Sequence, residues 1–412
     1  MRLRDCAEVL CLVTESRNPI NMKTVVFVKT ILTLDDIIPL LYQLRTQSLV
    51  EPPLFIAWDA QSLKYLNMNV VLMKAIHEMG GGIRGINVFR NRWLSQVHNL
   101  WVLRKLVISR HLIVETYPIG NKVTRLLIWL NRKLLNGIRI RSIFMNRPRR
   151  FARNTIAYYE AIREESSRRD SHILGFDYLL LSHPCEIHEE IHGIKIITDA
   201  KILNVGYTKG LPAWRKYLDR AALNYLKEGL KVPYLFFPLS AVGVGFISGE
   251  NSISMTEKLR ESLLVLKEYN AKILTVFKPH FKTDMDEFYR ILNEVGYRNY
   301  MVSYLHPDIL CRGAKFTFSY HSTSVFIDSY FIGCPTVEYA HYDTRFFELN
   351  KQRPRYLDAI DYFSHRDPDK LHKIMNSVLS EQATIVRDRQ KLSDDFFTLC
   401  PAEIERVFSF LR

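Results

Sequence analysis

The chain has 412 residues and a mass of 48.4 kDa, with 57 Lys and Arg against 43 Asp and Glu, which gives a formal net charge of +14. The 47% hydrophobic and 24% charged residues are typical of globular proteins and exclude a disordered or low-complexity chain. The longest apolar runs fall well short of the roughly 20 residues that a membrane-spanning helix needs. We therefore expect a soluble, cytoplasmic protein of two domains.

Short β-branched runs alternate with longer helical stretches along the whole chain. In the first half we expect strands over 24–28, 54–58, 85–89, 111–114, 176–181 and 195–197, with helices over 34–45, 70–79 and 154–169. In the second half we expect strands over 234–237, 272–277, 315–318 and 334–337, with helices over 214–228, 255–269, 285–295 and 324–332. Segment 206–210, with glycine at both ends, is interpreted as a flexible loop near the domain junction.

This strand–helix–strand repetition predicts an α/β protein with two Rossmann-like, doubly wound domains. We place an acceptor-binding domain at 1–228 and a nucleotide-sugar-binding domain at 229–412, the second ending in a helical tail. The six cysteines form no CxxC pair, so we expect no structural metal. Cys311 and Cys334 lie in apolar contexts and are expected in the core of a protein from a reducing compartment.

Most of the positive charge lies in one window. Residues 101–150 contain twelve Lys and Arg and a single acid, Glu115. Alternating basic and apolar residues suit an anionic membrane surface or a phosphorylated substrate. We therefore expect a surface that faces the acceptor or the membrane, made of Arg132, Lys133, Arg139, Arg141, Arg149 and Arg150. No nucleic-acid-binding motif accompanies the charge, so a nucleic-acid partner is not expected, although a plain solvated basic face stays an alternative.

Two motifs after predicted strands have the residue types of an anion site. Lys278-Pro279-His280 directly follows the strand over 272–277. The hydroxyl triplet of Ser322, Thr323 and Ser324 precedes an apolar helix, where one hydroxyl can cap the helix and the others can hold an anion. Because ligands of open α/β sheets bind beyond the carboxyl ends of the strands, we expect both motifs at one site. Glu338, after the strand over 334–337, is a candidate for binding ribose hydroxyls.

These motifs, running from Phe277 to Glu338, resemble the C-terminal half of bacterial surface-polysaccharide transferases of the GT-B fold. The nearest patterns are those of polysialyltransferase-like enzymes and CDP-glycerol glycerophosphotransferases, which grip a cytidine nucleotide with a His-Pro motif and a serine-pair motif. The resemblance covers about residues 200–350 and implies donor phosphate binding by Lys278, His280, Ser322, Thr323 and Ser324. Here proline precedes the histidine. The His-Pro at 306–307 is interpreted as a helix cap outside the donor motif.

Candidate catalytic groups also follow strands in the first half of the chain. A transferase that inverts the sugar carbon needs a general base for the acceptor hydroxyl, and Asp59 ranks slightly ahead of Glu115 for this role. His183, after another strand, is a third candidate and could touch the acceptor. His188 and His192 give a literal H-E-x-x-H pattern, but the glycine that follows leaves about one helical turn, too little for a zinc-protease helix.

The sequence thus predicts a metal-independent GT-B glycosyltransferase without a cofactor, using a nucleotide-sugar co-substrate. A CMP-linked acidic sugar is the favoured donor, and the acceptor is a glycan or glycolipid of capsule or lipopolysaccharide type, reached at the inner face of the cytoplasmic membrane. A CDP-glycerol-type polyol-phosphate transferase is the first alternative. A sugar-nucleotide epimerase and a nonenzymatic, basic nucleic-acid-binding protein follow.

Overall fold

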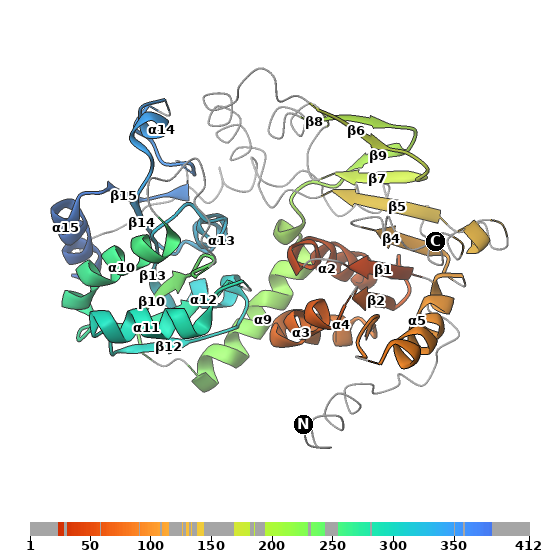
Figure 1. Ribbon diagram of the computed structural model, residues 1–412, viewed down its shortest axis with the longest axis horizontal. Helices are drawn as coiled ribbons and strands as arrows, with labels where there is room; N and C mark the ends of the chain where they lie inside the picture. Colours follow the sequence, from red (N-terminus) through yellow and green to blue (C-terminus); the bar gives the residue numbers. More distant parts are fainter. Residues whose placement is uncertain are drawn as a thin grey trace.

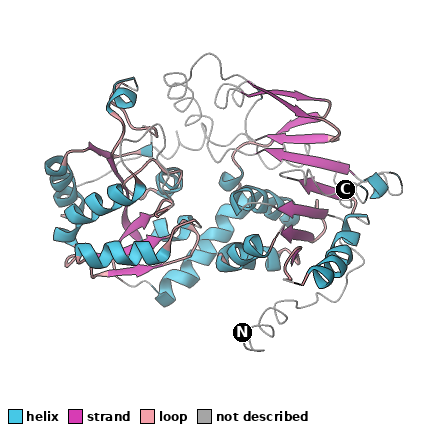
Figure 2. Cartoon of the chain, in the orientation of Figure 1, coloured by secondary structure: helices cyan, strands magenta, loops and turns pink. Residues whose placement is uncertain are grey.

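The computed structural model describes one part of the chain from 24 to 380, in these ranges: 24–28, 31–57, 59–89, 91–107, 109–114, 126, 129–131, 133, 138–143, 169–181, 185, 194–229, 232–243, 254–280, 282–349, 351–356 and 359–380. Two α/β domains lie side by side, the first in red to yellow-green and the second in green to blue (Figure 1). Helices flank the strands of both domains (Figure 2).

The N-terminal domain is built on a parallel sheet of seven strands in the order β3-β2-β1-β4-β5-β7-β9. The strands are β1 (Thr24–Val28), β2 (Pro53–Ala57), β3 (Gly82–Gly85), β4 (His111–Val114), β5 (Ile138–Ile143), β7 (Tyr178–Leu181) and β9 (Lys201–Asn204). After β1 the chain forms β2 and β3 on one side of that strand and then crosses over to form β4 and the later strands on its other side. Strands β1 and β4 pair in parallel. A separate pair, β6 (Arg169–Ile173) and β8 (Ile194–Thr198), forms a small second sheet.

Helices cover both faces of this sheet. Side chains of α2 (Ile31–Thr46), α4 (Val70–Glu78) and α9 (Pro212–Gly229) share one hydrophobic core with one face. The other face packs against α5 (Arg92–Val107). A further helix, α3 (Ala60–Met68), directly precedes α4. Strands β1, β2, β4 and β7 are therefore nearly continuous apolar runs, because a parallel sheet covered on both faces is buried on both.

The C-terminal domain repeats the plan with six parallel strands in the order β12-β11-β10-β13-β14-β15. They are β10 (Tyr234–Pro238), β11 (Leu274–Lys278), β12 (Tyr300–Val302), β13 (Ala314–Ser319), β14 (Thr336–Ala340) and β15 (Tyr362–His365). The helices between and after them are α10 (Met255–Leu266), α11 (Met285–Val295), α12 (Pro307–Gly313), α13 (Val325–Ile332), α14 (Thr344–Leu349) and α15 (Pro368–Leu379). This strand order is that of a Rossmann domain, with its switch point between β10 and β13.

Local sequence signals explain where several helices begin and end. The Asp284 carboxylate accepts the first free backbone N–H groups of α11, and Gly296 ends that helix with a left-handed φ of 74°. Ser254 and Glu257 form a capping box at the start of α10. The segment at 206–210 differs from the expected flexible loop, because Thr208–Gly210 form a short 3-10 helix with buried side chains.

Helix α9 joins the two domains and belongs to the N-terminal core through the buried Trp214, Tyr217 and Leu218. The Tyr217 hydroxyl donates to the backbone oxygen of Val71 at 2.6 Å. The next described strand after α9, β10, is part of the C-terminal sheet. We keep the division at residues 228 and 229 as a proposal that fits this arrangement.

The fold class agrees with the expectation: two Rossmann-like, doubly wound domains of GT-B type. The expected strand over 85–89 is wrong, because β3 ends at Gly85 and Asn87, with φ of 55°, turns the chain away. The expected tail is helical in α15, and its remainder lies outside the described residues, as does 154–168. Cys311 and Cys334 are buried in the core, as expected. No helix in the described part is long and apolar enough to cross a membrane.

Candidate functional site

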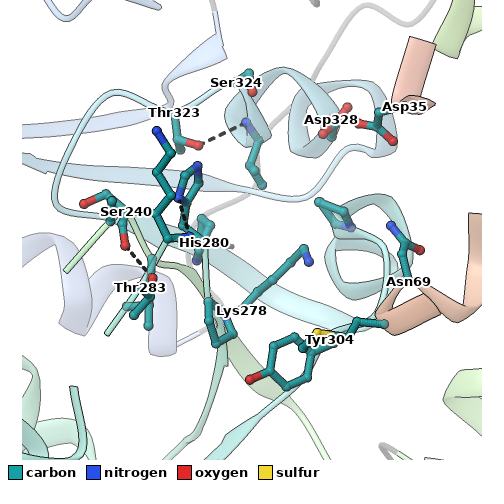
Figure 3. A pocket seen from close by; sticks show the side chains of 18 of the residues that line it. Asp35, Asn69, Ser240, Lys278, His280, Thr283, Tyr304, Thr323, Ser324 and Asp328 are labelled. Carbon is teal, nitrogen blue, oxygen red and sulfur yellow. Dashed lines mark hydrogen bonds between the residues drawn. The ribbon is translucent and has the colours of Figure 1, made fainter. Parts of the chain in front are cut away.

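A cavity of about 740 Å³ opens between the two domains, at the carboxyl ends of their strands. This volume suits a ligand of small-molecule size. Figure 3 shows Lys278 and His280 near its centre, with Asp35 and Asp328 together on one side and Asn69 and Tyr304 on another. Its charged groups are four lysines against two aspartates: Lys64, Lys209, Lys278, Lys282, Asp35 and Asp328.

The floor of the cavity is the switch point of the C-terminal sheet. The strands β10 and β13 pair in parallel there, and residues that follow them line the cavity. Ser240, after β10, and Tyr320, after β13, hold the two strand ends together, because the Ser240 backbone N–H donates to the Tyr320 hydroxyl at 3.2 Å. The hydroxyls of the same two residues lie 3.0 Å apart. These two contacts therefore fix the ends of β10 and β13 beneath the cavity.

Lys278 is the last residue of β11 and points into the cavity (Figure 3). Burial lowers the pKa of its ammonium group to about 8, although the nearby Asp35 carboxylate offsets part of this shift. No described residue forms a hydrogen bond or ion pair with this ammonium group. A partly buried cation without such a partner is costly, so the site favours an anion beside it.

His280 follows two residues later and also lines the cavity. Its Nδ1 accepts from the backbone N–H of Lys282 at 3.3 Å, which places the ring hydrogen on Nε2. Burial, together with Lys282 and Lys278, lowers the pKa of His280 to about 4. The imidazole is thus neutral at pH 7 and acts as a hydrogen-bond donor. Burial, Lys258 and His280 lower the pKa of His321, a lining residue that follows β13, to about 3.

The hydroxyl triplet divides at the start of α13. Thr323 and Ser324 line the cavity, whereas Ser322 is not among its described lining residues. The Thr323 hydroxyl accepts from the backbone N–H of Val325 at 3.3 Å and so serves as the cap. Ser324 is the N-cap residue but makes no side-chain capping bond. Its hydroxyl therefore lies at the positive end of the helix dipole without a capping duty.

The N-terminal wall carries a carboxylate that the sequence analysis missed. Asp35, in the first turns of α2, lines the cavity opposite the C-terminal sheet. Its Oδ2 accepts from the Lys209 ammonium at 2.5 Å, and its Oδ1 lies 2.7 Å from His306 Nε2. Burial opposes its ionisation, but Lys209 and His306 hold the pKa of Asp35 far below its usual range. Asp35 therefore stays a carboxylate at physiological pH.

His306 fixes the orientation of Asp35 from the other domain. Its Nδ1 accepts from the backbone N–H of Asp308 at 3.2 Å and caps α12, as predicted for this histidine. The ring hydrogen is therefore on Nε2 and donates to Asp35. With both ring nitrogens engaged, His306 acts by positioning Asp35 and by joining α12 to α2.

Lys209 lies between two carboxylates, one from each domain. Its ammonium is 3.8 Å from Asp328 Oδ1 on α13, in addition to the contact with Asp35. Burial opposes its charge, but Asp328 and Asp35 keep the pKa of Lys209 well above its usual value. Burial raises the pKa of Asp328, which also accepts from the Tyr207 hydroxyl at 3.3 Å. The cavity thus has a charge-paired side at Lys209 and a side with an uncompensated cation at Lys278.

Two predicted residues lie elsewhere. Asp59 caps α3 by accepting from the backbone N–H of Ser62 at 2.6 Å, and it is not among the described cavity-lining residues. Glu338 is fully buried in β14 and accepts from the Tyr342 hydroxyl at 2.8 Å. Burial raises the pKa of Glu338 to about 7. Ribose binding by Glu338, predicted from sequence, conflicts with this burial, because no face of the side chain is open to a ligand.

The remaining predicted residues separate into three groups. Glu115, His183, Arg132, Arg149 and Arg150 lie outside the described residues. Lys133 is exposed, in agreement with a surface role, and Arg141 lies on β5. Arg139 corrects the prediction of a uniform basic face, because it is buried on β5 and its Nε lies 3.6 Å from the Asp177 carboxylate. Its strand position turns it inward, where a bilayer or an acceptor has no access.

No family model and no curated protein sequence matches the chain. Among solved structures, it is similar to a protein assigned as a UDP-N-acetylglucosamine 2-epimerase from Listeria monocytogenes, with 12% identity, coverage of 93% of this chain and 94% of that chain, and a TM-score of 0.48. It is also similar to the wall teichoic acid polymerase TagF H548A, with 13% identity, 100% and 97% coverage and a TM-score of 0.47.

A third likeness is to a UGT transferase from Siraitia grosvenorii solved with UDP, with 9% identity, coverage of 94% of this chain and 99% of that chain, and a TM-score of 0.44. At these identities and TM-scores, the likenesses carry no argument about ligand or reaction.

Proposed function

We propose that the protein is a glycosyltransferase that binds a nucleotide-activated sugar in the interdomain cavity. One observation carries the proposal: Lys278 places a cation without a described partner at a strand end beside the switch point of a Rossmann domain. That edge is where such sheets bind nucleotides. The Lys278 ammonium would pair with a donor phosphate, and the neutral His280 and the Ser324 hydroxyl would donate hydrogen bonds to its oxygens.

Asp35 is the residue we assign to the acceptor side. In the proposed reaction the acceptor hydroxyl oxygen forms a bond to the sugar carbon, and the bond from that carbon to the donor phosphate breaks. The bonding electron pair leaves with the phosphate, which Lys278 stabilises, and the hydroxyl proton leaves to water. Because its pKa is held far below the usual range, Asp35 orients the hydroxyl as a hydrogen-bond acceptor and does not keep the proton. Asp35 keeps acceptor lone pairs besides those used by Lys209 and His306, so it can orient the hydroxyl.

The donor that we favour is a CMP-linked acidic sugar of sialic acid or Kdo type. The excess of lysines over aspartates in the cavity suits the carboxylate of such a sugar in addition to the phosphate. We propose a cell-surface polysaccharide or glycolipid, of capsule or lipopolysaccharide type, as the acceptor, with the enzyme acting at the inner face of the cytoplasmic membrane. CDP-glycerol would place its phosphates on the same groups and is the alternative donor.

A product assay tests the reaction. The protein is incubated with CMP-sialic acid, CMP-Kdo, CDP-glycerol and UDP-sugars, with and without glycan acceptors, and the released nucleotide and the glycans are followed by chromatography and mass spectrometry. We expect acceptor-dependent nucleotide release and a glycan of increased mass, both lost in Asp35→Asn and kept in the exposed-site control Asp286→Asn. Conversion of a UDP-sugar without acceptor would identify an epimerase. No turnover of any donor would refute the proposal.

A further inference from the structure

Helix α5 is apolar on two faces, and the described residues of the protein cover only one of them. Val102, Leu103 and Leu106 are buried against the N-terminal sheet. The remaining large apolar side chains stay in solvent and define the outer face of α5: Trp93 (67% exposed), Leu100 (56%), Val97 (49%), Leu94 (47%) and Trp101 (39%). A second apolar face on a helix is normally covered, and among the described residues the outer face has no such apolar cover.

The five residues form one continuous strip. At 100° per residue, positions 93, 94, 97, 100 and 101 fall within an arc of about 120°. Helix α5 lies on the side of the N-terminal domain that is remote from the C-terminal domain (Figure 1), and the strip is opposite the face that α5 packs against the sheet. The outer face is therefore separate from the proposed donor site.

Positive charge borders the outer face. The Cζ atoms of Arg84 and Arg104 each lie 5.4 Å from the centre of the Trp101 ring. Lys105 carries a third positive charge here. Burial and the nearby charges of Arg104 and Arg84 lower the pKa of its ammonium group. From 79 to 114 the sequence has six Lys and Arg and no Asp or Glu. Cationic side chains thus lie beside the strip.

We propose that the outer face of α5 docks the protein onto the surface of an anionic lipid bilayer. Tryptophan and leucine side chains insert at the level of the headgroups and upper acyl chains, while arginine and lysine bind lipid phosphates. Exposed tryptophans beside arginines are typical of that interfacial zone. A protein partner would need a complementary acidic, apolar surface, whereas a bilayer supplies both components over the whole strip. The inference does not depend on the transferase reaction.

Vesicle sedimentation tests the docking. The full-length protein is mixed with vesicles of phosphatidylcholine alone or with 30% phosphatidylglycerol added, without nucleotide. We expect binding to the anionic vesicles that weakens in high salt, and a loss of at least tenfold in partitioning for Trp93→Ser with Leu100→Ser. The matched control replaces two equally exposed leucines elsewhere, Leu223→Ser with Leu264→Ser, and should bind like wild type. Equal binding by both double variants would overturn the proposal.

Fluorescence identifies the inserted side chains. Brominated lipids should quench the wild-type tryptophan emission, and Trp93→Phe with Trp101→Phe should abolish the quenching while retaining sedimentation. Quenching that persists in this variant would place another tryptophan in the bilayer and contradict the assignment. Chromatography and thermal melts test whether protein, instead of lipid, covers the outer face. A wild-type dimer that becomes monomeric in Trp93→Ser with Leu100→Ser, or a lower melting temperature of that variant, would show that protein covers the outer face.

Discussion

Nucleotide binding should depend on pH through Lys278. Burial lowers the pKa of this ammonium to about 8, so about nine-tenths of it is charged at pH 7 and about one-tenth at pH 9. The phosphates of a nucleotide are essentially ionised across this range. If the donor binds only the charged form, its dissociation constant rises about tenfold between pH 7 and pH 9.

The perturbation that isolates this effect is Lys278→Met, which keeps the length of the side chain and removes the charge. A charge-assisted hydrogen bond contributes about 1.5–3 kcal/mol, so at pH 7 the variant should bind the nucleotide roughly 10- to 100-fold more weakly. Its dissociation constant should not change between pH 7 and pH 9. Lys267→Met, at an exposed position of the same domain, should behave like wild type.

Isothermal titration calorimetry at pH 7, 8 and 9 measures these constants directly. An unchanged wild-type constant over this range, or unchanged affinity in Lys278→Met, would refute the assignment of Lys278 to the phosphate. The pH dependence of folding stability in the unliganded protein gives a second test, and the direction of the expected change follows from the pKa of Lys278. Because the folded-state pKa of about 8 lies below the unfolded value of 10.5, wild type should gain stability as pH rises between these values, and Lys278→Met should not.

Three further changes have defined outcomes. Asp35→Asn should keep nucleotide affinity in calorimetry but lower kcat about 100-fold or more, and equal losses in affinity and kcat would argue against an acceptor role. Lys209→Met leaves Asp35 and Asp328 buried without their cation, so urea unfolding should show a loss of about 3–5 kcal/mol, and a loss below 1 kcal/mol would contradict the charge pairing. The folded-state pKa of Glu338, about 7 against 4.5, means that its ionisation destabilises the fold as pH rises between these values. The unfolding free energy of Glu338→Gln relative to wild type should therefore rise by about 3 kcal/mol from pH 4.5 to pH 8, and a difference independent of pH would exclude a buried, titrating Glu338.

Much of the fold could be predicted because its signals are local. The strand over 24–28 and the helix over 285–295 were predicted with the bounds that β1 and α11 have. Helix α5 was missed because its two apolar faces remove the one-sided periodicity that marks a surface helix. Strand β5 was missed because its alternating arginines resemble a basic surface segment, whereas Arg139 is buried beside Asp177.

The candidate site was predictable in its C-terminal half. Lys278 ends β11, His280 and Ser324 come after strand ends, and parallel strands bring their carboxyl ends together. The N-terminal half depends on how the domains pack, which no local pattern encodes. Asp59 follows β2 and caps α3, whereas Asp35 lies inside α2, and only the packing of α2 against Lys209 and His306 gives Asp35 its place in the site. Lys209 seemed part of a flexible loop because its two carboxylate partners are far away in sequence.

The central claim is that the interdomain cavity binds a nucleotide through Lys278 and His280. The most direct measurement is a thermal-shift panel of CMP, CDP, UDP and GDP on wild type, on His280→Ala and on His172→Ala, which changes an exposed histidine of the N-terminal domain. A nucleotide at 100 times its dissociation constant should stabilise the fold by about 2.7 kcal/mol. The account predicts a rise in melting temperature, with the cytidine nucleotides as its favoured ligands, that His172→Ala keeps and His280→Ala loses. No shift with any nucleotide, or an equal shift in all three proteins, would contradict it.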